Sequence, residues 1–142
     1  MQKPRLVSHF RHRAASFYAA ARDLTELNTV EDPYSAAIGL LAIHGCIAMA
    51  DALLVSSEGQ RGSADHSEAA RRLRSWCSAH GLEARGIKHF EWLLAKKSLF
   101  AYEEHPVSLD TLHDAKIRMD QFFAWALQMF PGVAQLAEVP NA

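Results

Sequence analysis

Residues 36–55 read AAIGLLAIHGCIAMADALLV, the longest apolar run in the chain, interrupted by His44 and Asp51. A membrane-spanning helix rarely carries both a histidine and an aspartate, so we interpret the run as the core of a folded domain. It predicts a helix from about Pro33 to Ser57, with the proline in the first turn. Because this helix is apolar almost all round, we expect other helices of the same domain to surround it, and we do not expect it to lie in a membrane.

Outward from this helix, apolar residues recur at three- and four-residue steps in four further stretches, which is typical of amphipathic helices. Asp65 and Ser108 are suitable N-caps, and Gly81 is a suitable residue to end a helix. The predicted helices cover about residues 5–27, 65–80, 82–103 and 109–130. The sequence therefore predicts one all-α domain over residues 1–142, an up-and-down bundle of about five helices.

Composition limits the function classes. The chain has 142 residues, 49% of them hydrophobic, and its 15 basic and 16 acidic residues give a formal net charge of −1. This balance argues against a dedicated DNA-coating protein. The first residues are basic but lack a following apolar segment, so no signal peptide is expected. Cys46 and Cys77 lie in apolar helical patterns, which predicts buried free thiols in a cytoplasmic protein.

Motifs for metal or covalent chemistry are missing from the sequence. There are eight histidines, but neither HExxH nor a paired ExxH pattern accompanies them, so we predict no metal and no cofactor. GxSxG, Walker A and GxGxxG patterns are also absent. Cys77 and His80 are helical neighbours, yet Cys77 aligns with Leu73 and Trp76, which favours packing over nucleophilic catalysis.

Polar residues inside apolar patterns mark the most informative positions. His44, Asp51 and Glu58 repeat at seven-residue steps and so share one helix face. Lys97 falls on an apolar stripe that also contains Phe90, Leu93, Leu94 and Ala101. Because a buried lone charge is costly, one hypothesis is that Asp51 and Lys97 face each other, with His44 or Tyr102 nearby. The alternative is that Lys97 reaches solvent and Asp51 caps a loop.

Basic residues form two groups along the chain, one before residue 23 and one around residues 61–74. Such cations can contact phosphates, or they can simply form solvated helix faces. The candidate basic patch comprises Arg11, Arg13, Arg71, Arg72 and Arg74.

Between residues 33 and 130 several short sequence motifs follow one another in a specific order. PYSAA at 33–37 opens an alanine-rich helix that contains His44 and ADALL at 50–54. A glycine-containing loop leads to Asp65-His66, and LLAKKSLFAY at 93–102 precedes PVS at 106–108 and a last helix with FAWA at 123–126. This order resembles the HEPN superfamily, small α-helical bundles that include RNA-cleaving toxins and antiphage proteins.

Active HEPN members carry an arginine, usually a polar residue after it, and a histidine four to six residues further on. Here Lys97, Ser98 and Tyr102 stand at those positions. Lysine can hold a phosphate as a point charge, whereas tyrosine is a poor general base at neutral pH. The resemblance therefore implies a site that binds without an assigned catalytic residue, and its candidates are Lys97, Tyr102, His66, Asp51 and His44.

Three functions follow as expectations. The first is a non-catalytic HEPN-like domain that binds nucleic acid or a nucleotide, or scaffolds a partner. The second is an atypical, metal-independent ribonuclease of the toxin type, in which Lys97 and a histidine act. The third is a purely structural bundle. The resemblance also implies a homodimer, formed through small residues on the 33–57 helix or an exposed face of the 82–103 helix, and an antitoxin or other protein partner.

Overall fold

The computed structural model describes residues 2–28, 33–102 and 106–136, and every regular element within them is a helix. The all-α prediction is thereby confirmed. In chain order the helices are α1 (Gln2–Leu27), α2 (Ser35–Glu58), α3 (His66–Ala79), α4 (Ile87–Ala95), α5 (Lys97–Tyr102), α6 (Leu109–Met129) and α7 (Pro131–Leu136).

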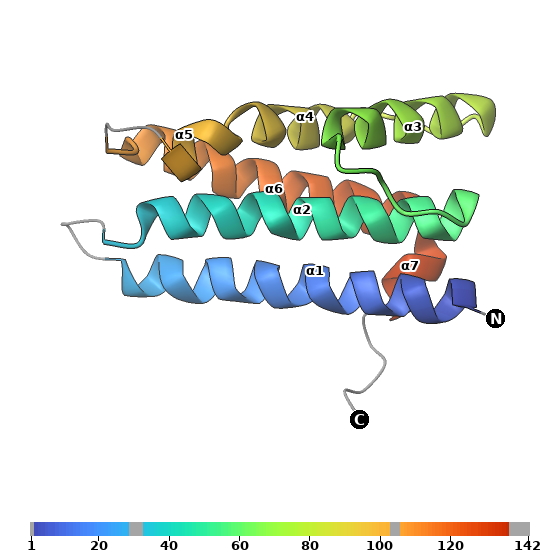
Figure 1. Ribbon diagram of the computed structural model, residues 1–142, viewed down its shortest axis with the longest axis horizontal. Coiled ribbons are helices and arrows are strands. Elements are labelled where there is room, and N and C mark those ends of the chain that lie inside the picture. The colour runs from blue at the N-terminus through green and yellow to red at the C-terminus, as the bar shows by residue number, and fades with distance from the viewer. Residues whose placement is uncertain (1, 29–32, 103–105, 137–142) are drawn as a thin grey trace.

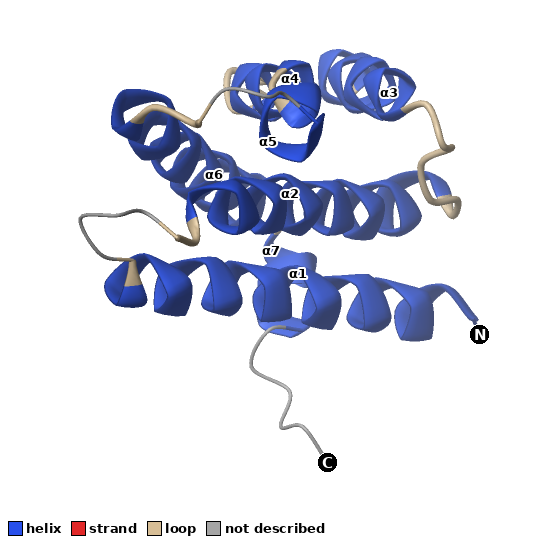
Figure 2. Ribbon diagram, turned by 60° about the vertical axis from the view of Figure 1, so that its left-hand side comes forward, coloured by secondary structure: helices blue, strands red, loops and turns tan. Residues whose placement is uncertain are grey.

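The helices form three layers around α2 (Figure 2). In Figure 1, α1 runs antiparallel to α2 along one side, and α3, α4 and α5 lie along the other side. The helix α6 packs against both α2 and α4, and α7 contacts α1, α2 and α6. The central helix therefore touches each of the other six helices, as its apolar sequence predicts.

Burial in the bundle accounts for the high proportion of apolar residues in α2. Its length and hydropathy would also suit a membrane span, but 78% of its most apolar window is buried inside the bundle. Cys46 and Cys77 are both buried free thiols, as predicted. Burial raises the pKa of each thiol, which disfavours the reactive thiolate.

Local signals fix several helix ends. The Asp65 side chain accepts a hydrogen bond from the Ser67 amide at 3.0 Å, and Ser108 accepts one from Thr111 at 3.1 Å. Both predicted N-caps are confirmed. Gly59 ends α2 with a φ of 82°, a left-handed conformation that glycine adopts without strain. The chain can therefore reverse sharply after α2 and enter the loop that leads to α3.

The predicted helix over residues 82–103 is wrong in one respect, because the structure contains two shorter helices there. Residues 82–86 precede α4, and Lys96 separates α4 from α5. A side chain at Gly86 would collide with the Trp125 ring at 2.1 Å, so tryptophan packing needs glycine at this point. The short helix α5 is anchored on α2 by Phe100, whose ring lies directly on Gly39.

The small residues of α2 serve contacts within the chain. A β-carbon at Gly45 would lie 3.4 Å from the Phe17 Cβ and 3.7 Å from the Tyr18 amide nitrogen, so α1 approaches α2 closely here. Ala48 and Ala52 are buried as well. This strip is therefore covered by the chain itself, which corrects the expectation that it forms a dimer contact.

Candidate functional site

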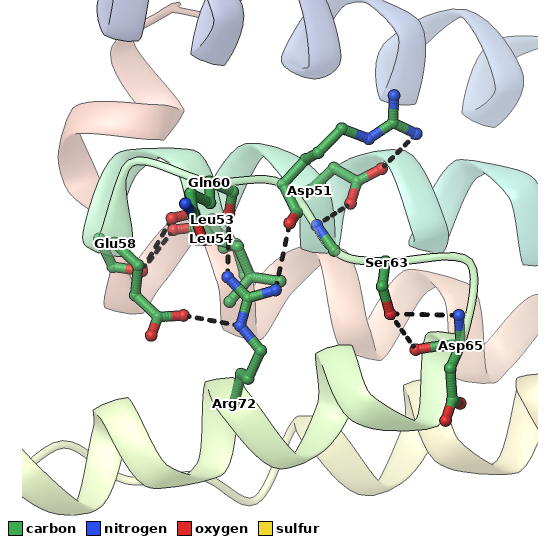
Figure 3. Close-up of polar contacts among 11 residues, drawn as sticks. Asp51, Leu53, Leu54, Glu58, Gln60, Ser63, Asp65 and Arg72 are labelled. Atoms are coloured by element: carbon green, nitrogen blue, oxygen red, sulfur yellow. Dashed lines mark hydrogen bonds and ion pairs between the residues drawn. The ribbon is translucent and has the colours of Figure 1, made fainter.

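Asp51 anchors the loop between α2 and α3. Its side chain is almost fully buried, with the residue 5% exposed, and it accepts a hydrogen bond from the Gly62 amide at 2.8 Å (Figure 3). The Arg61 Nη2 atom lies 3.7 Å from its other carboxylate oxygen. Burial raises the pKa of Asp51, while the Gly62 hydrogen bond and the Arg61 charge oppose this rise. Asp51 therefore caps a loop, as the alternative hypothesis proposed.

Arg72 fastens the same loop from α3. Its Nε donates to the Glu58 carboxylate at 3.1 Å, and its two terminal nitrogens donate to the carbonyls of Gln60 and Arg61, each at 3.1 Å (Figure 3). One planar guanidinium thus joins the end of α2 to two loop carbonyls. Together with Asp51, it fixes the first half of the loop, residues 60–62, and so positions the Arg61 backbone.

Arg61 extends from this loop toward α1. Its guanidinium carbon lies 5.0 Å from the centre of the Phe10 ring, which is cation–π distance, and its side chain remains 62% exposed. The guanidinium therefore lies between the Asp51 carboxylate and an aromatic face while still presenting donors to solvent. Periodicity did not single out Arg61 as a site residue; its signals were its place in the basic group around residues 61–74 and in the glycine-containing loop.

Two histidines and a lysine from three helices influence one another electrostatically, and one of them, His66, also responds to Asp51. His44 is exposed on α2, with its ring 5.9 Å from the Phe17 ring, and His66 is the half-buried first residue of α3. Lys97 is the half-buried first residue of α5. Partial desolvation by the surrounding helices lowers the pKa of both histidines, including the solvent-exposed His44, and the Lys97 charge lowers each of them further. Three helices therefore bring these side chains within electrostatic reach of one another.

Lys97 does not pair with Asp51, so the facing-pair hypothesis is wrong. No described carboxylate lies within 4.0 Å of the Lys97 ammonium in the parts of the chain that the structure covers. The oxygens of Asp51 are already engaged by Gly62 and Arg61. Asp51 nevertheless acts on the cluster, because its charge raises the pKa of His66 against the effect of burial.

Tyr102 lies apart from these residues. It is the last residue of α5 and is 82% exposed. It comes five positions after Lys97, which places the two side chains about 140° apart around the helix axis. We therefore define the cationic cluster as His44, Arg61, His66 and Lys97, and Tyr102 is not a member.

The predicted basic patch does not exist as one surface. Arg11 is buried, with only 6% of its surface exposed, whereas Arg13 and Arg71 are exposed. Arg72 is engaged by Glu58 and the loop, and Arg74 is paired with Glu91. The patch fails because ion pairs to neighbouring helices occupy two of its members and packing buries a third.

Other candidate chemistry has a packing explanation. The His80 ring stacks on Trp76 at 4.1 Å, and its Nδ1 lies 2.8 Å from the Trp76 carbonyl oxygen, so Trp76 holds the ring. Within residues 2–28, 33–102 and 106–136, no group of three or more His, Cys, Asp or Glu is arranged to hold a metal ion.

Comparisons with family models, curated proteins and solved structures find no match to this chain. The resemblance to HEPN domains therefore rests on the residues and their order alone. What the arrangement can do chemically is bind an anion, because the cationic cluster offers two permanent charges and two titratable ones, and the Asp51 carboxylate beside it is already engaged by Gly62 and Arg61.

Proposed function

We propose that this chain is a HEPN-like domain that binds RNA phosphates through the cationic cluster. The observation that carries the proposal is the convergence of His44, His66 and Lys97 from three different helices beside the loop cation Arg61. Phosphate groups accept hydrogen bonds from such donors and gain from their charge. Half-burial of His66 and Lys97 strengthens these contacts relative to fully solvated side chains.

The positions of the cluster support binding rather than a random charged surface. Arg61 lies in the loop that Asp51 and Arg72 fasten, and His66 begins α3 directly after its N-cap Asp65. Lys97 is held by α5, which Phe100 anchors on α2. Because the supporting contacts are buried or ion-paired, the donors are arranged before a ligand arrives, which lowers the ordering cost of binding.

Replacing Lys97 tests the proposal directly. We expect Lys97→Gln to weaken binding of a fluorescently labelled single-stranded RNA by about three- to tenfold, the value of one charge-assisted contact. The slope of log affinity against log salt should fall by about 0.7, because one phosphate contact is lost. Fluorescence anisotropy measures both quantities. Lys88→Gln, an exposed lysine on α4, is the matched control, and equal behaviour of the two variants would contradict the proposal.

RNA binding should also depend on pH. The pKa of His44 and that of His66 both lie below the usual value of 6.5, so both rings are mainly neutral at pH 7 in the free protein. A bound phosphate favours the charged imidazolium, so complex formation takes up protons. Affinity should therefore rise as the pH falls from about 7 to about 5.5. A His44→Gln, His66→Gln double variant should flatten this dependence in the same assay, and an unchanged profile would exclude the cluster.

A ribonuclease is the second candidate, favoured by the pairing of two histidines. Burial, the Lys97 charge and, least, the His66 charge lower the pKa of His44, so the two rings lie within electrostatic reach of each other. One neutral ring can accept the proton of an RNA 2′-hydroxyl as its oxygen attacks phosphorus. The other ring, protonated, can donate to the departing 5′-oxygen while Lys97 stabilises the phosphoryl charge.

Incubation of labelled RNA with the protein and a metal chelator separates the two candidates. The ribonuclease predicts products ending in a 2′,3′-cyclic phosphate, a bell-shaped pH profile, and loss of cleavage in both His44→Gln and His66→Gln. His113→Gln on α6, exposed to solvent, is the matched control, prepared identically to detect contaminating nuclease. Intact RNA in a preparation that binds it supports the non-catalytic domain instead.

A further inference from the structure

A second site lies between α1 and α6, where two nitrogens of a buried arginine have no hydrogen-bond partner among the described residues. Arg11 is only 6% exposed, and its Nε and Nη1 atoms are buried without a hydrogen-bond partner. The ion pairs found among the described residues do not include it. An unpaired buried guanidinium is costly, so a chain that keeps one at this position calls for an explanation.

Arg11 lines a pocket of about 340 Å³. One wall is a single face of α1, and the other is a single face of α6; the lining residues are Arg11, Ala15, Tyr18, Asp120, Phe123, Ala124 and Leu127. The helix α7 contacts both α1 and α6 and lies near their ends in Figure 1. The volume is at the small end of the range for organic ligands, and the walls are mainly apolar.

A polar bridge limits the pocket on one side. The Tyr18 hydroxyl donates to the Asp120 carboxylate at 2.5 Å, and the Tyr18 ring packs on Phe123 at 4.8 Å. Beyond this bridge a separate pocket continues along the same two helices. Because the bridge interrupts the groove, a continuous helix from a partner does not fit it as well as a small molecule does.

The charges of the pocket define the ligand. One guanidinium matches one negative charge, and its planar donors suit the two oxygens of a carboxylate. The Asp120 carboxylate at the bridge repels a doubly charged phosphate. The apolar walls accommodate an aromatic or branched body. We propose that Arg11 anchors a binding site for a small monocarboxylate with an apolar body.

This site is separate from the RNA-binding proposal. Arg11 belongs to α1 and faces α6, whereas the cationic cluster is built from α2, α3, α5 and the loop before α3. Burial lowers the pKa of Arg11, because desolvation disfavours the charged guanidinium. A carboxylate in the pocket would supply the missing counter-charge to the guanidinium.

Titration of the full chain with sodium benzoate tests the site, with benzamide and inorganic phosphate as comparison probes. Benzoate should shift the amide resonances of Ala15 and Ala124 and raise the thermal midpoint, whereas benzamide should do neither. Arg11→Met should weaken benzoate binding by about ten- to hundred-fold, the loss of a charge-assisted hydrogen bond. Arg5→Met, an exposed arginine on the same helix, should bind like the parent chain.

Other results would overturn the inference. Equal binding of benzamide and benzoate would mean that the pocket recognises only an apolar ring. Tighter binding of phosphate than benzoate, lost in Arg11→Met, would assign a different ligand class. No response to benzoate up to its solubility limit would leave Arg11 without a carboxylate ligand. Ala15→Phe, which fills the pocket and keeps Arg11, should also abolish benzoate binding, and retained binding in that variant would place the ligand elsewhere.

Discussion

Gly39→Ala is expected to destabilise the protein by about 3 kcal/mol, although alanine normally favours a helix over glycine by about 1 kcal/mol. The new β-carbon would lie 2.1–2.5 Å from three ring atoms of Phe100, so the whole ring must leave its site. Phe100 is only 3% exposed and is the buried anchor of α5. The substitution therefore combines steric overlap with loss of a buried aromatic contact.

Gly45→Ala is the matched control for this prediction, because it lies on the same helix and is also buried. Its β-carbon would meet Phe17 at an ordinary contact distance of 3.4 Å, so the helix-propensity gain should dominate. Urea unfolding followed by far-UV circular dichroism measures both variants. Equal stability of Gly39→Ala and Gly45→Ala would show that Phe100 does not seat on Gly39.

Gly39→Ala also connects the fold to the proposed function. Lys97 opens α5 only three residues before Phe100, so displacement of the ring moves the lysine away from His44 and His66. We therefore expect weaker RNA binding in this variant even under conditions where it remains folded. The helix that carries Lys97 is short, and it depends on tertiary packing for its position.

Much of the fold could be predicted from the sequence, because the spacing of apolar residues shows which face of a helix is buried. The all-round apolar pattern of α2 predicts a central helix, and side-chain caps such as Asp65 and Ser108 predict helix starts. The break at Lys96 could not be predicted, since the apolar spacing continues from Leu93 and Leu94 to Ala101 without glycine or proline. After the break, Phe100 packs onto Gly39, a tertiary contact that the local apolar spacing does not describe.

The candidate site was only partly predictable for a related reason. Asp51 was identified as a buried acid in need of a partner, but its partners depend on the path of the loop, which periodicity does not describe. His44, His66 and Lys97 were identified from their positions, whereas Arg61 was missed. Arg11 carried a signal that was overlooked, because it shares one helix face with Val7, Ala14 and Tyr18.

Arg11→Met is expected to raise the free energy of unfolding by about 2 kcal/mol, because it removes a buried charge that has no partner. Methionine retains much of the apolar stem that packs between α1 and α6, and it adapts to irregular space. Arg5→Met should change stability by less than about 0.5 kcal/mol, since Arg5 is exposed. Urea unfolding without added carboxylate measures both, and a clear loss of stability in Arg11→Met would show that the guanidinium has a stabilising partner in solution.

Ligand linkage makes this prediction specific to the proposed site. A carboxylate that binds the folded parent chain stabilises it in proportion to the logarithm of ligand concentration over the dissociation constant. Benzoate should therefore stabilise the parent chain and leave Arg11→Met nearly unchanged, so the difference between them narrows as benzoate increases. A general salt effect would act equally on both chains. We expect Arg11 to lower the stability of the empty protein and a bound carboxylate to restore that stability. This behaviour is expected of a residue that anchors a ligand, and not of a residue that only packs.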